Sequence, residues 1–145
     1  MERNFDLYEH QAQYYETDQM GIIHHSNYIR WFEESRTNLL DQMGFGYDQM
    51  EKLGIIVPVL AITCTYKSKV RYNDRVHIIP KIEEFNGIRL TISYQILDKT
   101  TGELRTTGES KHCFLDKNNR PVSLKKKQTE MYELFNAYLG VDLSS

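Results

Sequence analysis

The sequence has little cysteine, no long apolar run and no large excess of charge of one sign. Its two cysteines, Cys64 and Cys113, are too few for a disulfide framework, and neither lies in a zinc-binding spacing. No apolar stretch approaches the length of a membrane-spanning helix, and the first residues, MERNFDLYEH, lack the apolar core of a signal peptide. The net charge of −2 gives no overall positive field for nucleic acid. We therefore expect a cytoplasmic protein without a metal site, a membrane segment or a nucleic-acid partner.

The sequence does contain enough apolar and aromatic material for one core. It has 145 residues, of which 40% are hydrophobic and 12% aromatic, values typical of a folded chain rather than a disordered one. This length suits one domain with a proper core and is short for two. Because no repeat, low-complexity block or linker interrupts it, we expect a single domain over residues 1–145.

Residues 26–43 carry the apolar spacing of a helix with one buried face. That face consists of Tyr28, Trp31, Phe32, Ser35, Leu39, Leu40 and Met43. Ser26 is the predicted N-cap, and Gly44 is a natural C-terminal stop. The residues at 47–54 fit a short second helix, and the apolar spacing of residues 131–139 predicts a terminal helix.

The remaining segments read as strands, because they are rich in β-branched residues or alternate between apolar and polar positions. The predicted strands cover residues 4–15, 55–70, 75–85, 87–97 and 103–116. Pro58 places the start of its strand near a sheet edge. Asn86-Gly87 predicts a hairpin with a type I′ turn, and Gly108 predicts a bulge in the last strand.

This order of elements is typical of an α+β fold, in which an antiparallel sheet wraps one long helix. A helix covers only one face of such a sheet. The other face, or an edge, needs a partner, so we expect a dimer or a larger homo-oligomer.

The segment before the long helix has the residues of an acyl-transfer site. Asp18 lies between a strand and the helix start, with Gly21 three residues further on. Free N–H groups at a helix N-terminus favour a developing oxyanion, and a nearby carboxylate can activate water or attack a carbonyl. The spacing is equally compatible with an ordinary turn, since Asp and Gly are common turn residues.

Two neighbouring pairs of side chains add further candidates. His24 and His25 are adjacent, so their side chains do not face one another as a metal pair would, but either ring could orient the acid or contact a substrate carbonyl. Glu33 and Glu34 form a rival acid pair inside the helix, where a solvated face paired with Arg30 is the alternative.

The stretch YYETDQMGIIHHSNYIRWFEESR resembles the signature of hotdog-fold acyl-CoA thioesterases of the 4-hydroxybenzoyl-CoA thioesterase superfamily, in particular the YbgC-like branch. The matching residues are Tyr14, Thr17, Asp18, Gly21, Ile22, Ile23, His24, His25, Asn27, Tyr28, Trp31, Phe32, Glu33 and Arg36. The segment YKSKVRYNDRVHI resembles a second family segment through Tyr72 and Asp74, although Val70 and Arg71 stand where many relatives carry a proline. The element order derived above is also that of the hotdog fold.

The resemblance implies a role for each matching residue. Asp18 would be the catalytic carboxylate, as nucleophile or general base, with His25 positioning the substrate or the acid and Tyr14 beside them. The substrate and oxyanion region would include Gly21, Ser26 and Asn27, with main-chain N–H groups near His25 and Ser26 polarising the thioester carbonyl. The resemblance implies no metal or redox cofactor, and it implies dimers or tetramers with sites at subunit interfaces.

A basic group should also face the phosphates of coenzyme A. Lys67, Lys69 and Arg71 cluster around one loop and are the candidates, with ordinary solvated strand residues as the alternative. The predicted reaction is hydrolysis of acyl-CoA to a carboxylic acid and CoA. A hotdog module that binds acyl thioesters without cleaving them, and a thioesterase acting on acyl carrier protein, stay open. The sequence leaves open the acyl chain length, the nucleophile or base role, and dimer or tetramer.

Overall fold

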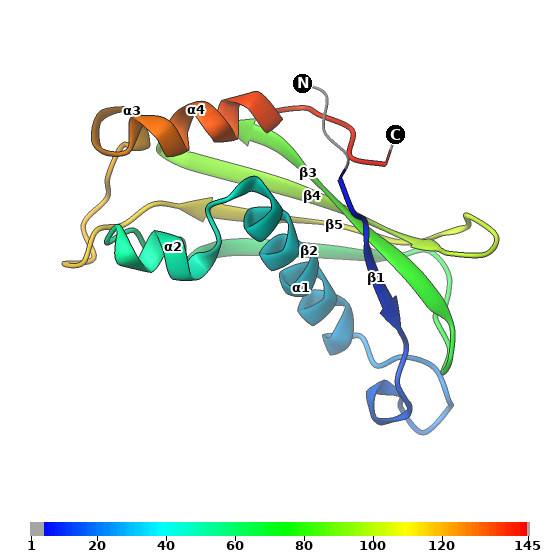
Figure 1. Cartoon of the computed structure of the whole chain (residues 1–145). Helices are drawn as coiled ribbons and strands as arrows, with labels where there is room; N and C mark the ends of the chain where they lie inside the picture. The colour runs from blue at the N-terminus through cyan, green and yellow to red at the C-terminus, as the bar shows by residue number, and fades with distance from the viewer. Residues whose placement is uncertain (1–4, 145) are drawn as a thin grey trace.

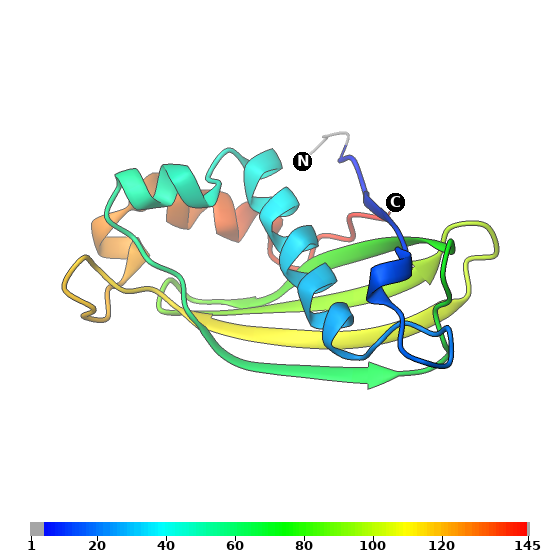
Figure 2. The same ribbon diagram turned by 90° about the horizontal axis from the view of Figure 1, so that it is seen from below.

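The computed structural model describes residues 5–144, in which an antiparallel sheet curves around one long helix (Figure 1). The sheet has five strands in the order β1-β3-β4-β5-β2, and every neighbouring pair is antiparallel. The strands are β1 Tyr8–Gln11, β2 Val59–Tyr66, β3 Arg75–Phe85, β4 Arg89–Asp98 and β5 Leu104–Cys113. The helices are η1 Tyr14–Glu16 (a 3₁₀ turn), α1 Ser26–Met43, α2 Tyr47–Lys52, α3 Leu124–Lys127 and α4 Thr129–Tyr138. Figure 2 shows that the helices lie over one face of the sheet.

The α1 helix confirms the predicted range of 26–43 and buries the predicted face. It ends at Gly44, whose φ of 95° is the left-handed conformation that glycine adopts at helix ends. On the buried face, the rings of Phe32 and Tyr94 stack with their centroids 4.5 Å apart. This close approach depends on Gly108, because a Cβ atom there would collide with Phe32 and with the Thr63 carbonyl oxygen. Gly108 is therefore a packing glycine, and the predicted bulge is wrong, since Gly108 pairs in register with both Cys64 and Tyr94.

A chain of buried hydrogen bonds joins α1 to the sheet. Arg36 donates from Nη1 to Tyr94 Oη at 2.9 Å, and Tyr94 Oη lies 2.6 Å from Ser110 Oγ. Ser110 Oγ lies 2.7 Å from His112 Nε2, and His112 Nδ1 lies 3.2 Å from the Pro58 carbonyl oxygen. Arg36 only donates and a carbonyl only accepts, so every hydroxyl hydrogen points from Arg36 toward Pro58, and His112 carries its proton on Nδ1. We call this the guanidinium chain.

Several predicted boundaries differ from the structure around the first segment. The predicted strand 4–15 is strand only over Tyr8–Gln11, because the chain turns into η1 at Tyr14; residue 4 lies outside the described residues. Ser26 is not the N-cap. His25 occupies that position, without a side-chain cap bond, because the Ser26 hydroxyl is bonded to His24 Nδ1 at 2.9 Å.

The later strands and turns are shorter or of a different type than predicted. The strand predicted over 55–70 is regular only over Val59–Tyr66, and the last strand ends at Cys113 rather than at residue 116. The hairpin at Asn86-Gly87 forms, but only Gly87 has a positive φ, as in a type II′ turn. The Asn86 side chain accepts from the amides of Ile88 and Arg89 at 2.9 and 2.8 Å, which fixes this turn.

The two outer strands are β1 and β2, so the edge position predicted from Pro58 is confirmed. On β2, Val59 and Leu60 are exposed large apolar side chains. Among residues 5–144, no helix is both long and apolar enough to cross a membrane.

Candidate active site

The loop between η1 and α1 folds into a small hairpin that carries Asp18. Thr17 and Ile23 form an isolated β-bridge, and the Asp18 amide donates to the Ile22 carbonyl at 2.8 Å. Gly21 makes the turn with a φ of 77°, a conformation that costs little only for glycine. We call residues 17–23 the Asp18 hairpin.

The Asp18 carboxylate is half-buried, and only one of its oxygens is used within the protein. Oδ1 accepts from the Met20 amide at 2.7 Å and lies 3.4 Å from the Ile22 amide. No donor in the described chain is bonded to Oδ2. The hairpin therefore fixes the carboxylate through one oxygen and leaves the other available.

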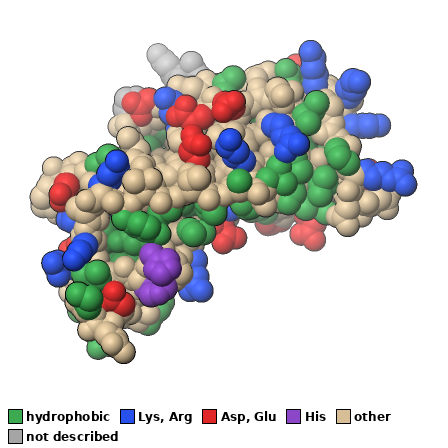
Figure 3. All heavy atoms as spheres, turned by 180° about the vertical axis from the view of Figure 1, so that it is seen from behind, with side chains coloured by type: hydrophobic (Ala, Val, Ile, Leu, Met, Phe, Trp, Pro, Cys, Tyr) green, Lys and Arg blue, Asp and Glu red, His purple; other side chains and the backbone are tan. Residues whose placement is uncertain are grey.

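Asp18 borders an open cavity of about 360 Å³ at the start of α1. The lining residues are Asp18, Ile22, Ile23, His24, His25, Tyr28, Tyr66, Lys67, Ser68 and Lys69. Figure 3 shows histidine side chains beside apolar ones and an acidic group at one end of the molecule, with Lys and Arg around them. The cavity thus combines apolar walls, an acid, two imidazoles and two ammonium groups.

At the start of α1, one main-chain N–H group is left without a partner. The Ser26 amide donates to His24 Nδ1 at 3.2 Å, and the Asn27 amide donates to the His24 carbonyl at 3.0 Å. The His25 amide donates to no acceptor among residues 5–144. The Asn27 side chain is buried and donates to the Glu16 carbonyl at 2.9 Å. Of the predicted oxyanion groups, the amide of His25 is the one free to bind a substrate oxygen.

The structure brings some predicted site residues together and leaves others out. Asp18, His25, Lys67 and Lys69 line the same cavity. Tyr14 is 75% exposed and is absent from the lining; its ring meets that of Tyr72 edge-on at 5.7 Å.

Three further predicted residues lie outside the lining of the cavity. Gly21 shapes the hairpin, and Ser26 supports the His24 ring, but neither lines the cavity. Arg71 also lies outside the lining, where its main chain forms a β-bridge with Ile22 of the hairpin.

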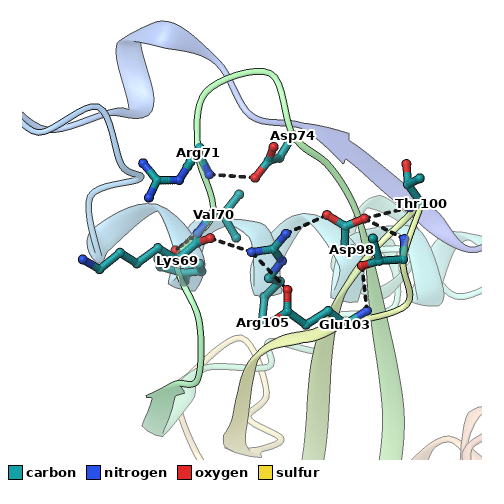
Figure 4. Close-up of polar contacts among 10 residues, drawn as sticks. Lys69, Val70, Arg71, Asp74, Asp98, Thr100, Glu103 and Arg105 are labelled. Carbon is teal, nitrogen blue, oxygen red and sulfur yellow. Dashed lines mark hydrogen bonds and ion pairs between the residues drawn. The ribbon is translucent and has the colours of Figure 1, made fainter.

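The wall formed by residues 66–69 is held from the far side by Arg105 (Figure 4). Arg105 Nη1 donates to the Lys69 carbonyl at 2.7 Å, and the Arg105 carbonyl accepts from the amides of Lys67 and Ser68 at 2.9 and 3.0 Å. The guanidinium also pairs with Asp98 through Nη2 at 2.8 Å. The Thr101 amide and the Arg105 guanidinium lower the pKa of Asp98 to about 2, so this ion pair is charged at neutral pH.

Sequence reasoning missed several residues that build the site. Tyr66 and Ser68 line the cavity, and Arg105 fixes its wall, yet no short motif signals a contact across the sheet. Glu16 lies just beyond the predicted strand 4–15 and no sequence signal marks it, although it is buried and hydrogen-bonded to α1. Within residues 5–144, no three His, Cys, Asp or Glu side chains gather as metal ligands.

The fold is a sheet wrapped around a long helix, with Asp18 in the loop before that helix. Comparison with known proteins identifies the class of protein that has this arrangement. The sheet and helices match hotdog-fold thioesterases. A model of the thioesterase-like superfamily matches residues 13–134, so this chain belongs to that superfamily.

Individual relatives agree. YneP of Bacillus subtilis (strain 168), named as a candidate acyl-CoA thioesterase, is 38% identical over 119 residues, covering 81% of this chain and 86% of that protein. The acyl-CoA thioester hydrolase YbgC of Escherichia coli O6:H1 (strain CFT073) is 27% identical over 86 residues, 59% of this chain and 64% of that protein. A DHNA-CoA thioesterase structure from Staphylococcus aureus superposes with a TM-score of 0.84 and 33% identity, covering 90% of this chain and 88% of that one.

Proposed function

We propose that this protein is an acyl-CoA thioesterase that hydrolyses an acyl-CoA to a free carboxylic acid and CoA. One observation carries the proposal: Asp18, with an unused carboxylate oxygen, and His25, with an unused main-chain N–H, border one cavity. The names of the related proteins favour the same reaction.

In this proposal the His25 amide binds the thioester carbonyl oxygen and stabilises the negative charge that develops there. One such donor is typically worth about 10²–10³ in rate. Asp18 acts as general base, taking a proton from the water whose oxygen attacks the carbonyl carbon. The carbon–sulfur bond then breaks, and the CoA thiolate takes up a proton. Alternatively, Oδ2 of Asp18 attacks the carbonyl itself and forms an anhydride that water hydrolyses.

The His25 ring and the basic residues would hold the substrate. His25 lines the same cavity as Asp18, so its imidazole would contact the acyl group or the acid. Lys67 and Lys69 line the same cavity, and Arg71 follows them beside the hairpin. Their charges would attract the phosphates of CoA, whereas Tyr14 lies outside the cavity and is left with a role at its rim.

The exposed apolar side chains of the β2 edge support a homo-oligomer, dimer or tetramer, because an unpaired edge strand invites pairing with another copy. Light scattering of the purified chain tests this part. A cytoplasmic location, with both cysteines free, completes the proposal.

The decisive experiment measures release of free thiol from a panel of substrates by the native chain and by Asp18→Asn. The panel holds straight-chain acyl-CoAs, an aromatic 1,4-dihydroxy-2-naphthoyl-CoA, and the same acyl groups on acyl carrier protein. We expect Asp18→Asn to lower kcat by about 10²–10⁴-fold, and the panel to give the preferred acyl group and carrier.

The matched control is Glu33→Gln, which makes the same chemical change at an exposed acid of α1 outside this cavity. It should keep native activity. Equal rates for the native chain and Asp18→Asn would remove Asp18 from the mechanism. Tight binding of every acyl-CoA without thiol release would instead identify a binding module.

A further inference from the structure

Glu16 is a buried acid in direct hydrogen-bond contact with three separate segments. Its side chain is among the buried polar groups, at 5% exposure. Oε1 accepts from the Gln13 amide at 2.9 Å and from His10 Nε2 at 2.8 Å, and Oε2 accepts from Trp31 Nε1 at 2.8 Å. These partners belong to the segment before η1, to β1 and to α1. We call Glu16 and these three residues the carboxylate cluster.

Two of the three partners of the Glu16 carboxylate, the Gln13 amide and the Trp31 indole, can only donate, and the His10 ring can donate from Nε2, so the contacts suit an anion. Burial alone would raise the pKa of Glu16, but the hydrogen bonds from His10, Gln13 and Trp31 more than offset burial, and the pKa is lowered. A carboxylate only accepts hydrogen bonds at neutral pH. The main-chain N–H of Gln13 and the indole N–H of Trp31 can only donate them. A hydrogen-bond acceptor is therefore needed at both positions that the Glu16 oxygens occupy.

The main chain of Glu16 ties both ends of the Asp18 hairpin to the start of α1. The Glu16 carbonyl accepts from the His24 amide at 2.9 Å and from the Asn27 side chain at 2.9 Å. One residue therefore fixes the chain just before Asp18 through its carbonyl, and fixes that same point to the side of α1 through its carboxylate. The His25 amide follows directly after His24.

We propose that Glu16 is a positioning residue of the thioesterase site: its buried carboxylate sets the distance between the Asp18 carboxylate and the His25 amide. This inference rests on the proposed function. Asp18 and His25 need a defined separation, because one must reach the attacking water and the other the carbonyl oxygen of the same thioester. A displacement of about 1 Å can lower the rate by 10²-fold.

Glu16→Gln tests the charge and the acceptor pattern without changing the size of the side chain. A glutamine amide offers one oxygen and one NH₂ group. If the NH₂ group faces Trp31, two donors meet; if it faces Gln13, two donors meet there instead, although His10 can adapt by changing tautomer. Either orientation forces one contact apart and shifts the hairpin relative to α1.

The experiment measures kcat and KM of the native chain, Glu16→Gln, Trp31→Phe and the double variant with the best acyl-CoA of the panel. We expect Glu16→Gln to lower kcat about 10- to 100-fold. KM should change less than about threefold, because the Glu16 carboxylate makes no hydrogen bond to Lys67, Lys69 or Arg71, the groups proposed to hold CoA. Trp31→Phe removes one donor, so the double variant should recover part of the kcat that Glu16→Gln loses.

Ser110→Ala is the matched control, since it removes a buried hydrogen bond of the guanidinium chain and touches no residue of the Asp18 hairpin. It should lower the melting temperature while keeping kcat. All rates are measured well below the melting temperature of each variant. If Glu16→Gln does not fold, Trp31→Phe tests the same carboxylate in its place.

The outcomes separate the two proposals. Thiol release by the native chain with unchanged kcat in Glu16→Gln, or in Trp31→Phe where that variant stands in for it, overturns the role of Glu16 alone. A rise in KM with constant kcat assigns Glu16 to substrate binding and overturns positioning. No thiol release by the native chain from any substrate overturns the proposed function and this inference with it.

Discussion

The two halves of α1 are held by buried polar groups of opposite kind. Near its start, the carboxylate cluster holds the chain before Asp18 against Trp31. Further along, the guanidinium chain holds Arg36 against strands β4 and β5. The first is an anion whose partners in the cluster all donate. The second is a cation whose partners are the hydroxyls of Tyr47 and Tyr94, at 2.9 Å each.

This difference decides what each group can tolerate. The amide of Gln13 and the indole of Trp31 can only donate, so loss of the carboxylate leaves both N–H groups without an acceptor. The hydroxyls around Arg36 can still donate when the guanidinium is gone, as Tyr94 already does to Ser110. The carboxylate cluster therefore fixes one arrangement of the chain before the Asp18 hairpin, whereas the guanidinium chain contributes to packing that other side chains could replace.

The largest expected effect separates the two groups by stability. Glu16→Leu should lower the free energy of unfolding by about 3–5 kcal/mol, because it leaves buried donors without an acceptor. Arg36→Met should change it by less than about 1 kcal/mol, since it also removes the cost of burying a cation without a carboxylate partner. Urea unfolding at one fixed protein concentration measures both. Equal losses in the two variants would contradict the comparison.

The next effect is a loss of stability in mild acid. Burial, with the nearby charge of Arg36, lowers the pKa of His112 from 6.5 to about 4. Between these pH values the unfolded chain binds a proton that the folded one does not. The contribution of neutral His112 to the free energy of unfolding is therefore fully present above pH 6.5. It falls by about 3 kcal/mol in all as the pH drops to 4.

The guanidinium chain and the carboxylate cluster should lose stability in different pH windows. Because the pKa of Glu16 is lowered from 4.5, its stabilisation is present above pH 4.5 and lost only below it. Urea unfolding of the native chain and of His112→Asn at pH 7.5, 5.5 and 4.5 resolves the first window. Arg36→Met removes a nearby positive charge, so it should raise the pKa of His112 in the folded chain. The pH range over which stability is lost should then be narrower. If the difference in free energy of unfolding between the native chain and His112→Asn were the same at pH 7.5 and at pH 4.5, His112 would not be responsible for the loss.

A smaller effect is expected where α1 meets the sheet between the two groups. Gly108→Ala places a methyl group against Phe32 and the Thr63 carbonyl. We expect a loss of about 1–3 kcal/mol from overpacking, measured by thermal unfolding. Gly102→Ala serves as control for a glycine with nothing near its missing Cβ; its φ of 76° adds backbone strain but no collision.

The smallest effect concerns the cavity wall. Arg105→Met removes the bond to the Lys69 carbonyl and should raise KM for acyl-CoA about threefold, in line with the loss of one hydrogen bond. The value of kcat should stay the same, because the Asp18 hairpin keeps its own contacts. A drop in kcat of the size expected for Glu16→Gln would mean that residues 66–69 also position the proposed catalytic groups.

Local signals were sufficient for the long helix and for the presence of the hairpin at Asn86-Gly87. The bounds of α1 follow from one apolar stripe and Gly44. The motif around Asp18 identified the acid and His25, and both line the cavity. Gly108 was misread because a glycine in a strand looks the same whether it makes a bulge or admits a ring from another element.

Two of the missed features depend on contacts between distant residues. Glu16 receives a hydrogen bond from Trp31, fifteen positions later, and Arg105 supports a wall that is 36 positions earlier at Lys69. Serine is a common N-cap residue, but the Ser26 hydroxyl is hydrogen-bonded to His24 Nδ1 and does not cap the helix. The contacts of Glu16 and Arg105 arise from the tertiary fold, which no local pattern encodes, whereas the bond between His24 and Ser26 joins residues only two positions apart.

The one-way order of the guanidinium chain has a consequence for proton movement. A proton wire works by passing a proton along and then turning every hydroxyl over for the next transfer. Here one end is an arginine, which does not give up its proton in proteins, and the other is the Pro58 carbonyl, which does not take one. The guanidinium chain therefore conducts no protons. In the proposed hydrolysis, the released protons would leave through the open cavity beside Asp18 instead.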